Sequence, residues 1–177
     1  AKGVSDKGME HLSIMKRLRE VDLEGTRVSE WGVVDLAKIR SLRRVSLKFL
    51  ALSIEAMDAL AKLPSLQYLA LDSTSFGDKE VSLAASFKQL RGLSLRGTKI
   101  TDRLFESLIK SASLIILDLS ETAITDAGLK SLSAMKGIRS LNLSSTASTL
   151  PRGRYPLSTK ASSRRDASSF KEPVSSP

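Results

Sequence analysis

The sequence repeats itself with a period of 24 residues, and this period limits the possible folds more than any other feature. Six positions of the unit are apolar in every copy apart from Ser111, with no insertion or deletion between copies. The leading position holds Leu18, Leu42, Leu66, Leu90, Leu114 and Ile138. A unit of this length cannot bury its own apolar face, so a stable fold requires neighbouring copies stacked around a shared core.

The two halves of each unit follow different hydrophobic periods. The first half reads L-x-x-L-x-L, as in residues 114–119, and ends in the alternation of a short strand. The second half places apolar residues at i, i+3 and i+6, which favours one buried face of a helix. Serine or threonine precedes this helix in five units and predicts an N-cap, at Ser5, Ser29, Ser53, Thr101 and Thr125. An acidic residue follows in most units, and we expect it to face solvent near the positive end of the helix dipole.

The unit L-x-x-L-x-L-x-x-T-x-I-T-D-x-G-L-x-x-L resembles the leucine-rich repeat family, most clearly in residues 117–132, LDLSETAITDAGLKSL. It looks most like the cysteine-containing-like subclass found in bacterial and F-box-type proteins. The resemblance implies an α/β solenoid, a right-handed β-α superhelix with a concave parallel sheet and convex helices. It also implies that a threonine side chain bonds the turn backbone after each strand, except at Leu50, where we expect a different turn.

The repeat pattern divides the chain into two parts. Residues 1–149 form the predicted leucine-rich repeat domain, with a half repeat at 1–17 and units that start at 18, 42, 66, 90, 114 and 138. Residues 150–177 contain seven serines and four of the five prolines, with six Lys or Arg against two Asp or Glu. This composition predicts a disordered basic tail. Alternatively, its apolar residues fold back over the last strand, which otherwise offers an open edge for edge-strand or end-to-end association.

The residue inventory leaves little room for catalysis. The chain has no cysteine and a single histidine, His11, which we expect to be exposed. No phosphate-binding glycine loop, paired-carboxylate pocket or Ser-His-Asp set occurs, so we predict no enzymatic activity, no cofactor and no metal site. No apolar run approaches the roughly 18 residues of a membrane span, and the N-terminus lacks the apolar segment of a secretory signal. These features predict a cytoplasmic protein.

The resemblance implies a non-catalytic platform for protein–protein interaction. Strand residues between the core leucines would point to the concave face, where aromatic and arginine anchors concentrate binding energy. The predicted contacts are Arg44, Lys48, Phe49, Tyr68, Asp72, Arg96, Ile116 and Asp118. A plainer interpretation is that every repeat must expose some residue there, whatever the function.

The net charge of +9 suggests a second surface. Basic residues gather where helices end and strands begin: Lys16, Arg17, Arg19, Lys38, Arg40, Arg43, Lys62, Lys88, Arg91, Lys110, Lys136 and Arg139. Such a basic ridge, with the tail, is typical of docking to an acidic protein, to RNA or the ribosome, or to an anionic membrane. The negative end of the helix dipole also favours cations at helix C-termini, and this explains the position of the basic residues without any partner.

Two further interpretations remain open. The F-box resemblance implies a substrate-recognition role in a ubiquitin ligase adaptor, although no F-box precedes the repeats. Trp31 shares its column with charged residues and should lie on the convex, solvent side. An exposed tryptophan there is either an interface anchor or, as we expect, folded over a neighbouring turn.

Overall fold

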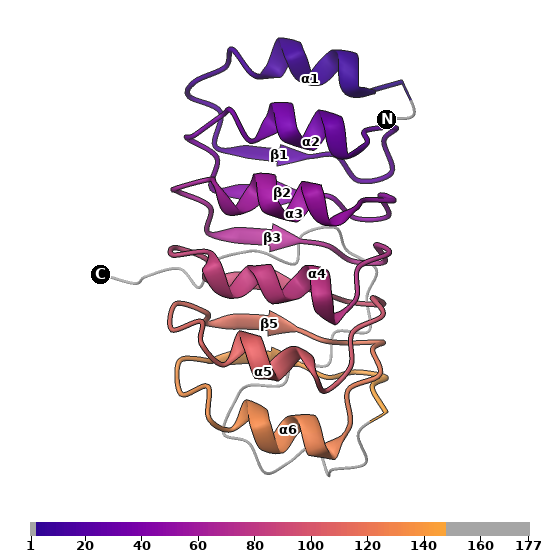
Figure 1. Cartoon of the computed structure of the whole chain (residues 1–177), viewed down its shortest axis with the longest axis vertical. Coiled ribbons are helices and arrows are strands. Elements are labelled where there is room, and N and C mark those ends of the chain that lie inside the picture. The colour runs from indigo at the N-terminus through magenta and orange to yellow at the C-terminus, as the bar shows by residue number, and fades with distance from the viewer. Residues whose placement is uncertain (1–2, 148–177) are drawn as a thin grey trace, which may run out of the picture.

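A computed structural model describes residues 3–147 of the chain. Helices and strands alternate along it, and Figure 1 shows them as two layers, with every helix on the same side of the sheet. The helices are α1 (Asp6–Leu12), α2 (Glu30–Leu36), α3 (Ile54–Ala61), α4 (Asp78–Ser82), the 3-10 helix η1 (Leu83–Ser86), α5 (Leu104–Leu108) and α6 (Asp126–Leu132). The strands are β1 (Glu20–Asp22), β2 (Arg44–Ser46), β3 (Tyr68–Ala70), β4 (Gly92–Ser94), β5 (Ile116–Asp118) and β6 (Ser140–Asn142). The predicted tail, including Leu150, Tyr155 and Leu157, lies outside the described residues.

The strands form one open parallel sheet in the order β1-β2-β3-β4-β5-β6. Each strand pairs with the next at an offset of one repeat, so that Val21 is opposite Val45 and Leu93 is opposite Leu117. Helices occupy more width than strands, so the stack curves with the sheet on its inner side. We call the sheet surface opposite the helices the concave face. The α/β leucine-rich repeat solenoid expected from the sequence is therefore confirmed.

The core lies between the two layers and is built from the repeating apolar columns. Leu42, Leu66 and Leu90 of the leading column are at most 1% exposed. The half repeat before the first unit is less well covered, because only one of its sides has a neighbouring unit within the described residues. Met15 there is 48% exposed, although its equivalents Ile39 and Phe87 are buried.

The turn after each strand uses one conformation throughout. The residue two positions after the core leucine has positive φ in all six turns: Gly25, Phe49, Ser73, Gly97, Glu121 and Ser145. The backbone N–H of this residue continues the sheet ladder, as when Phe49 N donates to the carbonyl of Asp72 at 2.9 Å. Threonine then donates its hydroxyl to the carbonyl of the leucine three residues earlier, as Thr74 does at 2.7 Å.

Leu50 replaces this threonine in the second unit, and the expected change of turn does not occur. Leu50 N still donates to the carbonyl of Leu47 at 3.3 Å, and Phe49 has a φ of 60°, as in the other turns. The Leu50 side chain is buried at 3% exposure. Apolar burial replaces the missing hydroxyl bond, so the backbone geometry is kept.

The acidic residues at the helix starts do not simply face solvent, as the sequence suggested. Asp102 accepts hydrogen bonds from the backbone N–H of Thr125, at 2.8 Å, and from the Thr125 hydroxyl. The same pair of bonds joins Asp6 to Ser29 and Asp78 to Thr101. These half-buried carboxylates therefore tie the helix start of one repeat to that of the next.

A glycine in the next helix makes room for this carboxylate. A Cβ on Gly128 would lie 2.1 Å from Oδ1 of Asp102, and one on Gly32 would lie 2.5 Å from Oδ1 of Asp6. Leu104 occupies the glycine's place in the fourth unit, beside Asp78. There α5 begins at Leu104, two positions later in the repeat than α6 begins.

Candidate functional site

The concave face presents the first and third residue of each three-residue strand. Their columns run in register across the sheet, so that Arg44 lies opposite Tyr68 and Tyr68 lies opposite Gly92. The eight residues predicted as partner contacts lie in β2, β3 and β5 or in the turns that follow β2, β3 and β4. The structure therefore brings them onto one surface, although their environments differ.

Tyr68 presents less surface than the sequence suggested. It is only 8% exposed, because the guanidinium carbon of Arg44 lies 4.3 Å from the centre of its ring. The neighbour in register on the other side, Gly92, is also buried. Arg44 also pairs with Glu20, Nε to Oε1, at 3.3 Å. A stack of this kind contributes about 0.5–1 kcal/mol at an exposed site and about 2 when desolvated.

Lys48 lies between carboxylates of the two neighbouring repeats. Its Nζ is 4.0 Å from Oε2 of Glu24 and 3.3 Å from Oδ2 of Asp72. Asp72 is only 9% exposed and also accepts a hydrogen bond from the Ser94 hydroxyl. The charges of this part of the face are therefore largely engaged with one another.

Arg96 and Glu121 form the next pair along the sheet. Nη2 of Arg96 lies 2.7 Å from Oε1 of Glu121. The Arg96 side chain is 55% exposed and the Glu121 side chain 48% exposed. The hydrogen bond from Arg96 lowers the pKa of Glu121, while the hydrogen bond to Glu121 raises the pKa of Arg96. An exposed pair of this kind stabilises the fold by less than about 1 kcal/mol.

Asp118 serves the turn after β5 more than the surface. Its Oδ1 accepts from the backbone N–H of Ser120 at 2.9 Å and from the Ser120 hydroxyl at 2.6 Å. Its Oδ2 accepts from the amide of Asn142 at 3.0 Å. Ile116, at the start of the same strand, is half-buried.

Phe49 is the residue of the predicted set that projects most clearly. It is 59% exposed and lies in the turn after β2 with a φ of 60°. Bulky side chains seldom adopt this left-handed region, because the Cβ approaches the following carbonyl at a cost of roughly 1–2 kcal/mol. Two equivalent turns use glycine, at Gly25 and Gly97. The second turn therefore displays an aromatic ring on a strained backbone.

The basic ridge lies where the strands begin. Arg19, Arg43, Arg91 and Arg139 directly precede β1, β2, β4 and β6. The last two arginines line a cleft of about 420 Å³ with Lys88 and Lys136. Lys38 and Lys62 belong to the predicted ridge but pair with Asp35 and Asp58 of their own helices.

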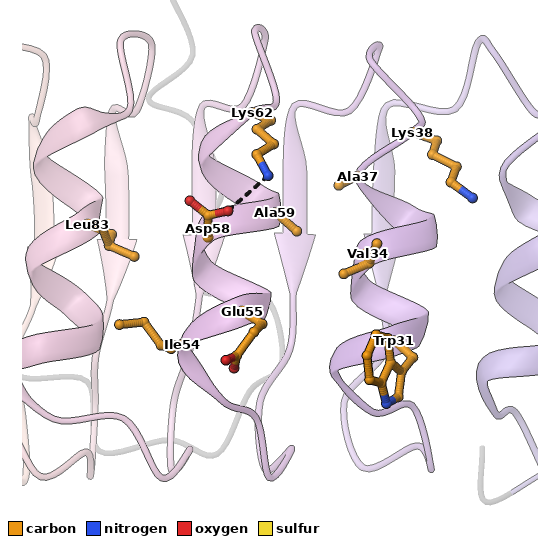
Figure 2. A pocket seen from close by; sticks show the side chains of 10 residues that line it. All are labelled: Trp31, Val34, Ala37, Lys38, Ile54, Glu55, Asp58, Ala59, Lys62 and Leu83. Atoms are coloured by element: carbon orange, nitrogen blue, oxygen red, sulfur yellow. Dashed lines mark hydrogen bonds and ion pairs between the residues drawn. The ribbon is translucent and has the colours of Figure 1, made fainter.

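A groove that the sequence did not predict runs along the convex side. It has a volume of about 700 Å³ and lies over α2, α3 and the start of η1 (Figure 2). Trp31 and Val34 line it from α2, Ile54 from α3 and Leu83 from η1. Trp31 is 71% exposed, so the expectation that it folds over a neighbouring turn was wrong. The sequence did hold one sign of this groove, because Trp31 and Val34 are apolar residues of the same helix that lie outside the core columns.

The described part of the chain also bears on metal sites and membrane spans. Within residues 3–147, no three acidic or histidine side chains gather in a way that could hold a metal ion. In the same part of the chain, no helix combines the length and the apolar character needed to span a membrane. His11 is exposed, as expected.

The in-register strands, the shared left-handed turns and the helical outer layer define the leucine-rich repeat solenoid fold. A family model described as leucine-rich repeat matches residues 110–133, which is one period of the chain. No curated protein sequence matches the chain. The finer assignment to the cysteine-containing-like subclass stays a prediction.

Solved structures with the same fold come from bacteria and plants. Internalin C2 of Listeria monocytogenes is similar with a TM-score of 0.60 and 22% identity, over 76% of this chain and 55% of the internalin. An internalin, inlF, of the same organism gives 0.55 and 16% identity, over 81% and 46%. The leucine-rich repeat ectodomain of the Arabidopsis thaliana receptor kinase GASSHO1/SCHENGEN3, solved with Casparian strip integrity factor 2, gives 0.54 and 16%, over 78% and 17%. The chain thus spans little more than half of the internalin C2 structure and less of the others.

Proposed function

We propose that this chain is a non-catalytic protein-binding module that receives its partner on the concave face. The observation that carries the proposal is the Phe49 ring, which is 59% exposed beside the ion pairs of Lys48 and Arg44. A partner that covers this ring would gain the apolar burial that the domain itself does not use.

The surrounding face supports this role through rigidity. Lys48 is held between Glu24 and Asp72, and Arg44 is held on Tyr68. Groups that are already ordered lose little conformational freedom when a partner binds, and this lowers the cost of association. The similar plant ectodomain was solved with a protein factor, which is consistent with the same general use of the fold.

Nucleic-acid or ribosome docking through the ridge and tail has weaker support. Sequence-tolerant binding of single strands uses aromatic side chains as stacking platforms. The cleft on the ridge is lined by cations, small residues and Ile115, with no aromatic residue among its described lining. A role in a ubiquitin ligase adaptor and a cytoplasmic location remain predictions that rest on the sequence alone.

The test compares two exposed aromatic residues on opposite sides of the solenoid. Partners are captured with the whole chain, with Phe49→Ser and with Trp31→Ser, in low and high salt, and are identified by mass spectrometry. We expect a salt-tolerant partner that Phe49→Ser loses and Trp31→Ser retains. Loss with Trp31→Ser alone would place the site on the convex groove and overturn the concave-face proposal.

A further inference from the structure

The basic cleft at the edge where the strands begin has a regular internal spacing. Its four cations are Lys88, Arg91, Lys136 and Arg139, and Ile115 lies between the two pairs. The two pairs occupy equivalent repeat positions 48 residues apart, and the equivalent positions midway between them hold Ala112 and Ile115. Two cationic rows therefore flank a small apolar strip.

These cations are available to a ligand. All four side chains are exposed, and within residues 3–147 none of them forms an ion pair with an acidic residue. No acidic residue lines the cleft. Lys38 and Lys62, elsewhere on the ridge, are instead paired within their own helices. The positive charge at the cleft is consequently uncompensated by the described part of the protein.

The sheet fixes the distance between the two rows. The strand after Arg91 and the strand after Arg139 are separated by one intervening strand, so the rows lie about 9–10 Å apart. A polyproline II helix rises about 3.1 Å per residue with three residues per turn. Residues i and i+3 of such a helix thus lie on one side, about 9.3 Å apart, which matches the two rows.

We propose that this cleft binds an extended acidic segment of a partner protein, with carboxylates three residues apart on the two cationic rows. The chain between the carboxylates passes over Ile115 and Ala112, and one of its two intervening residues faces them. The half-buried Ile115 offers an apolar contact, which an acidic peptide with apolar intervening residues uses and a phosphate backbone does not. The site is separate from Phe49, which lies past the opposite ends of the strands, so each surface can be tested without the other.

The direct test measures the affinity of fluorescent peptides for the whole chain by anisotropy at low salt. One peptide repeats the unit Glu-Pro-Pro, and the second has the same composition with its glutamates adjacent. An oligouridine of equal charge serves as the nucleic-acid probe. We expect the regularly spaced peptide to bind most tightly of the three, with an affinity that falls as salt is added.

A matched pair of charge reversals locates the binding. Lys136→Glu with Arg139→Glu should weaken the spaced peptide by about tenfold or more. Arg40→Glu with Arg43→Glu changes the same two repeat positions and the same net charge two repeats before Lys88 and Arg91, away from the cleft, and should have a much smaller effect. Because these residues are exposed, thermal unfolding of both variants should match that of the parent chain.

Four results would overturn the proposal. Equal loss with the two double variants would mean that the whole ridge attracts anions without a site. Equal binding of the two peptides would remove the spacing argument, and tighter binding of oligouridine would assign the cleft to nucleic acid. Failure of the spaced peptide to bind at low salt would remove the site altogether, and it would leave the Phe49 experiment unaffected.

Discussion

Two glycines at the same position of the repeat should respond in opposite ways to the same substitution. Gly8 and Gly128 are each the third residue of their helix, α1 and α6. A Cβ on Gly8 would make only an ordinary contact, 3.7 Å from Cγ1 of Val4. A Cβ on Gly128 would lie 2.1 Å from Oδ1 of Asp102 and 2.9 Å from Cε2 of Phe105. Gly128→Ala therefore forces Asp102 away from Thr125.

The magnitude follows from the bonds that Asp102 would lose. Hydrogen bonds to a charged group contribute about 1.5–3 kcal/mol each, and Asp102 accepts two of them from Thr125. At the lower end the loss is about 3 kcal/mol, and the better helix propensity of alanine offsets about 1 kcal/mol of it. Gly128→Ala should thus destabilise by about 2 kcal/mol, whereas Gly8→Ala should stabilise by up to about 1 kcal/mol. The melting temperature of Gly128→Ala should fall by roughly 4–8 °C.

The assay is urea unfolding followed by circular dichroism, with a double-mutant cycle as its control. Asp102→Ala removes the carboxylate with which the new methyl group collides. In that background Gly128→Ala should cost far less, because only the contact with Phe105 remains. Equal free energies of unfolding for Gly8→Ala and Gly128→Ala, or additive effects in the cycle, would refute the coupling of carboxylate and glycine.

The other predictions concern backbone strain, pH and packing. Phe49→Gly should stabilise the chain by about 1 kcal/mol in urea unfolding while it weakens partner capture, since it relieves the left-handed strain of a ring that is 59% exposed. The Glu121 carboxyl should titrate by NMR below its ordinary value of 4.5, and Arg96→Gln should raise that midpoint. Because the pKa is lowered in the folded state, the small stabilisation by this pair should be present near neutral pH and lost as pH falls through the folded pKa. Phe105→Ala, at 1% exposure, should cost about 3–5 kcal/mol in urea unfolding, whereas Ile109→Ala, at 41%, should cost much less.

The sequence predicted the fold closely because one unit is repeated without insertions. The strand register is the repeat offset itself, so the pairing of Leu93 with Leu117 could be read directly from the spacing of the leucines. The position of the basic ridge followed for the same reason. The late start of α5 could not be read in this way, because it accompanies Leu104 beside Asp78, whereas Gly32 and Gly128 stand beside Asp6 and Asp102.

The environments of the candidate residues were harder to predict, because they depend on the neighbouring repeats. Tyr68 occupies an outward position, yet its exposure is decided by Arg44 and Gly92, which are a full repeat away on either side. The carboxylate of Asp102 looks like a solvent-facing helix residue until Thr125 is placed beside it. Periodicity predicts the face on which a side chain lies. The residues of the two flanking repeats determine what the side chain contacts there.

Charge counts along the concave face are therefore a poor guide to its partner. Lys48, Arg96 and Asp72 each have a counter-charge within 3.3 Å, so these groups need no partner for their stability. A partner that buries such a pair must remove water from both charges, which costs free energy. The attraction between the two charges exists already in the free domain, so it adds nothing to the affinity. Selective binding energy must instead come from groups that the domain leaves unsatisfied. On this face that group is Phe49, and on the strand-start edge it is the cationic cleft, so the first should drive salt-tolerant binding and the second binding that weakens with salt.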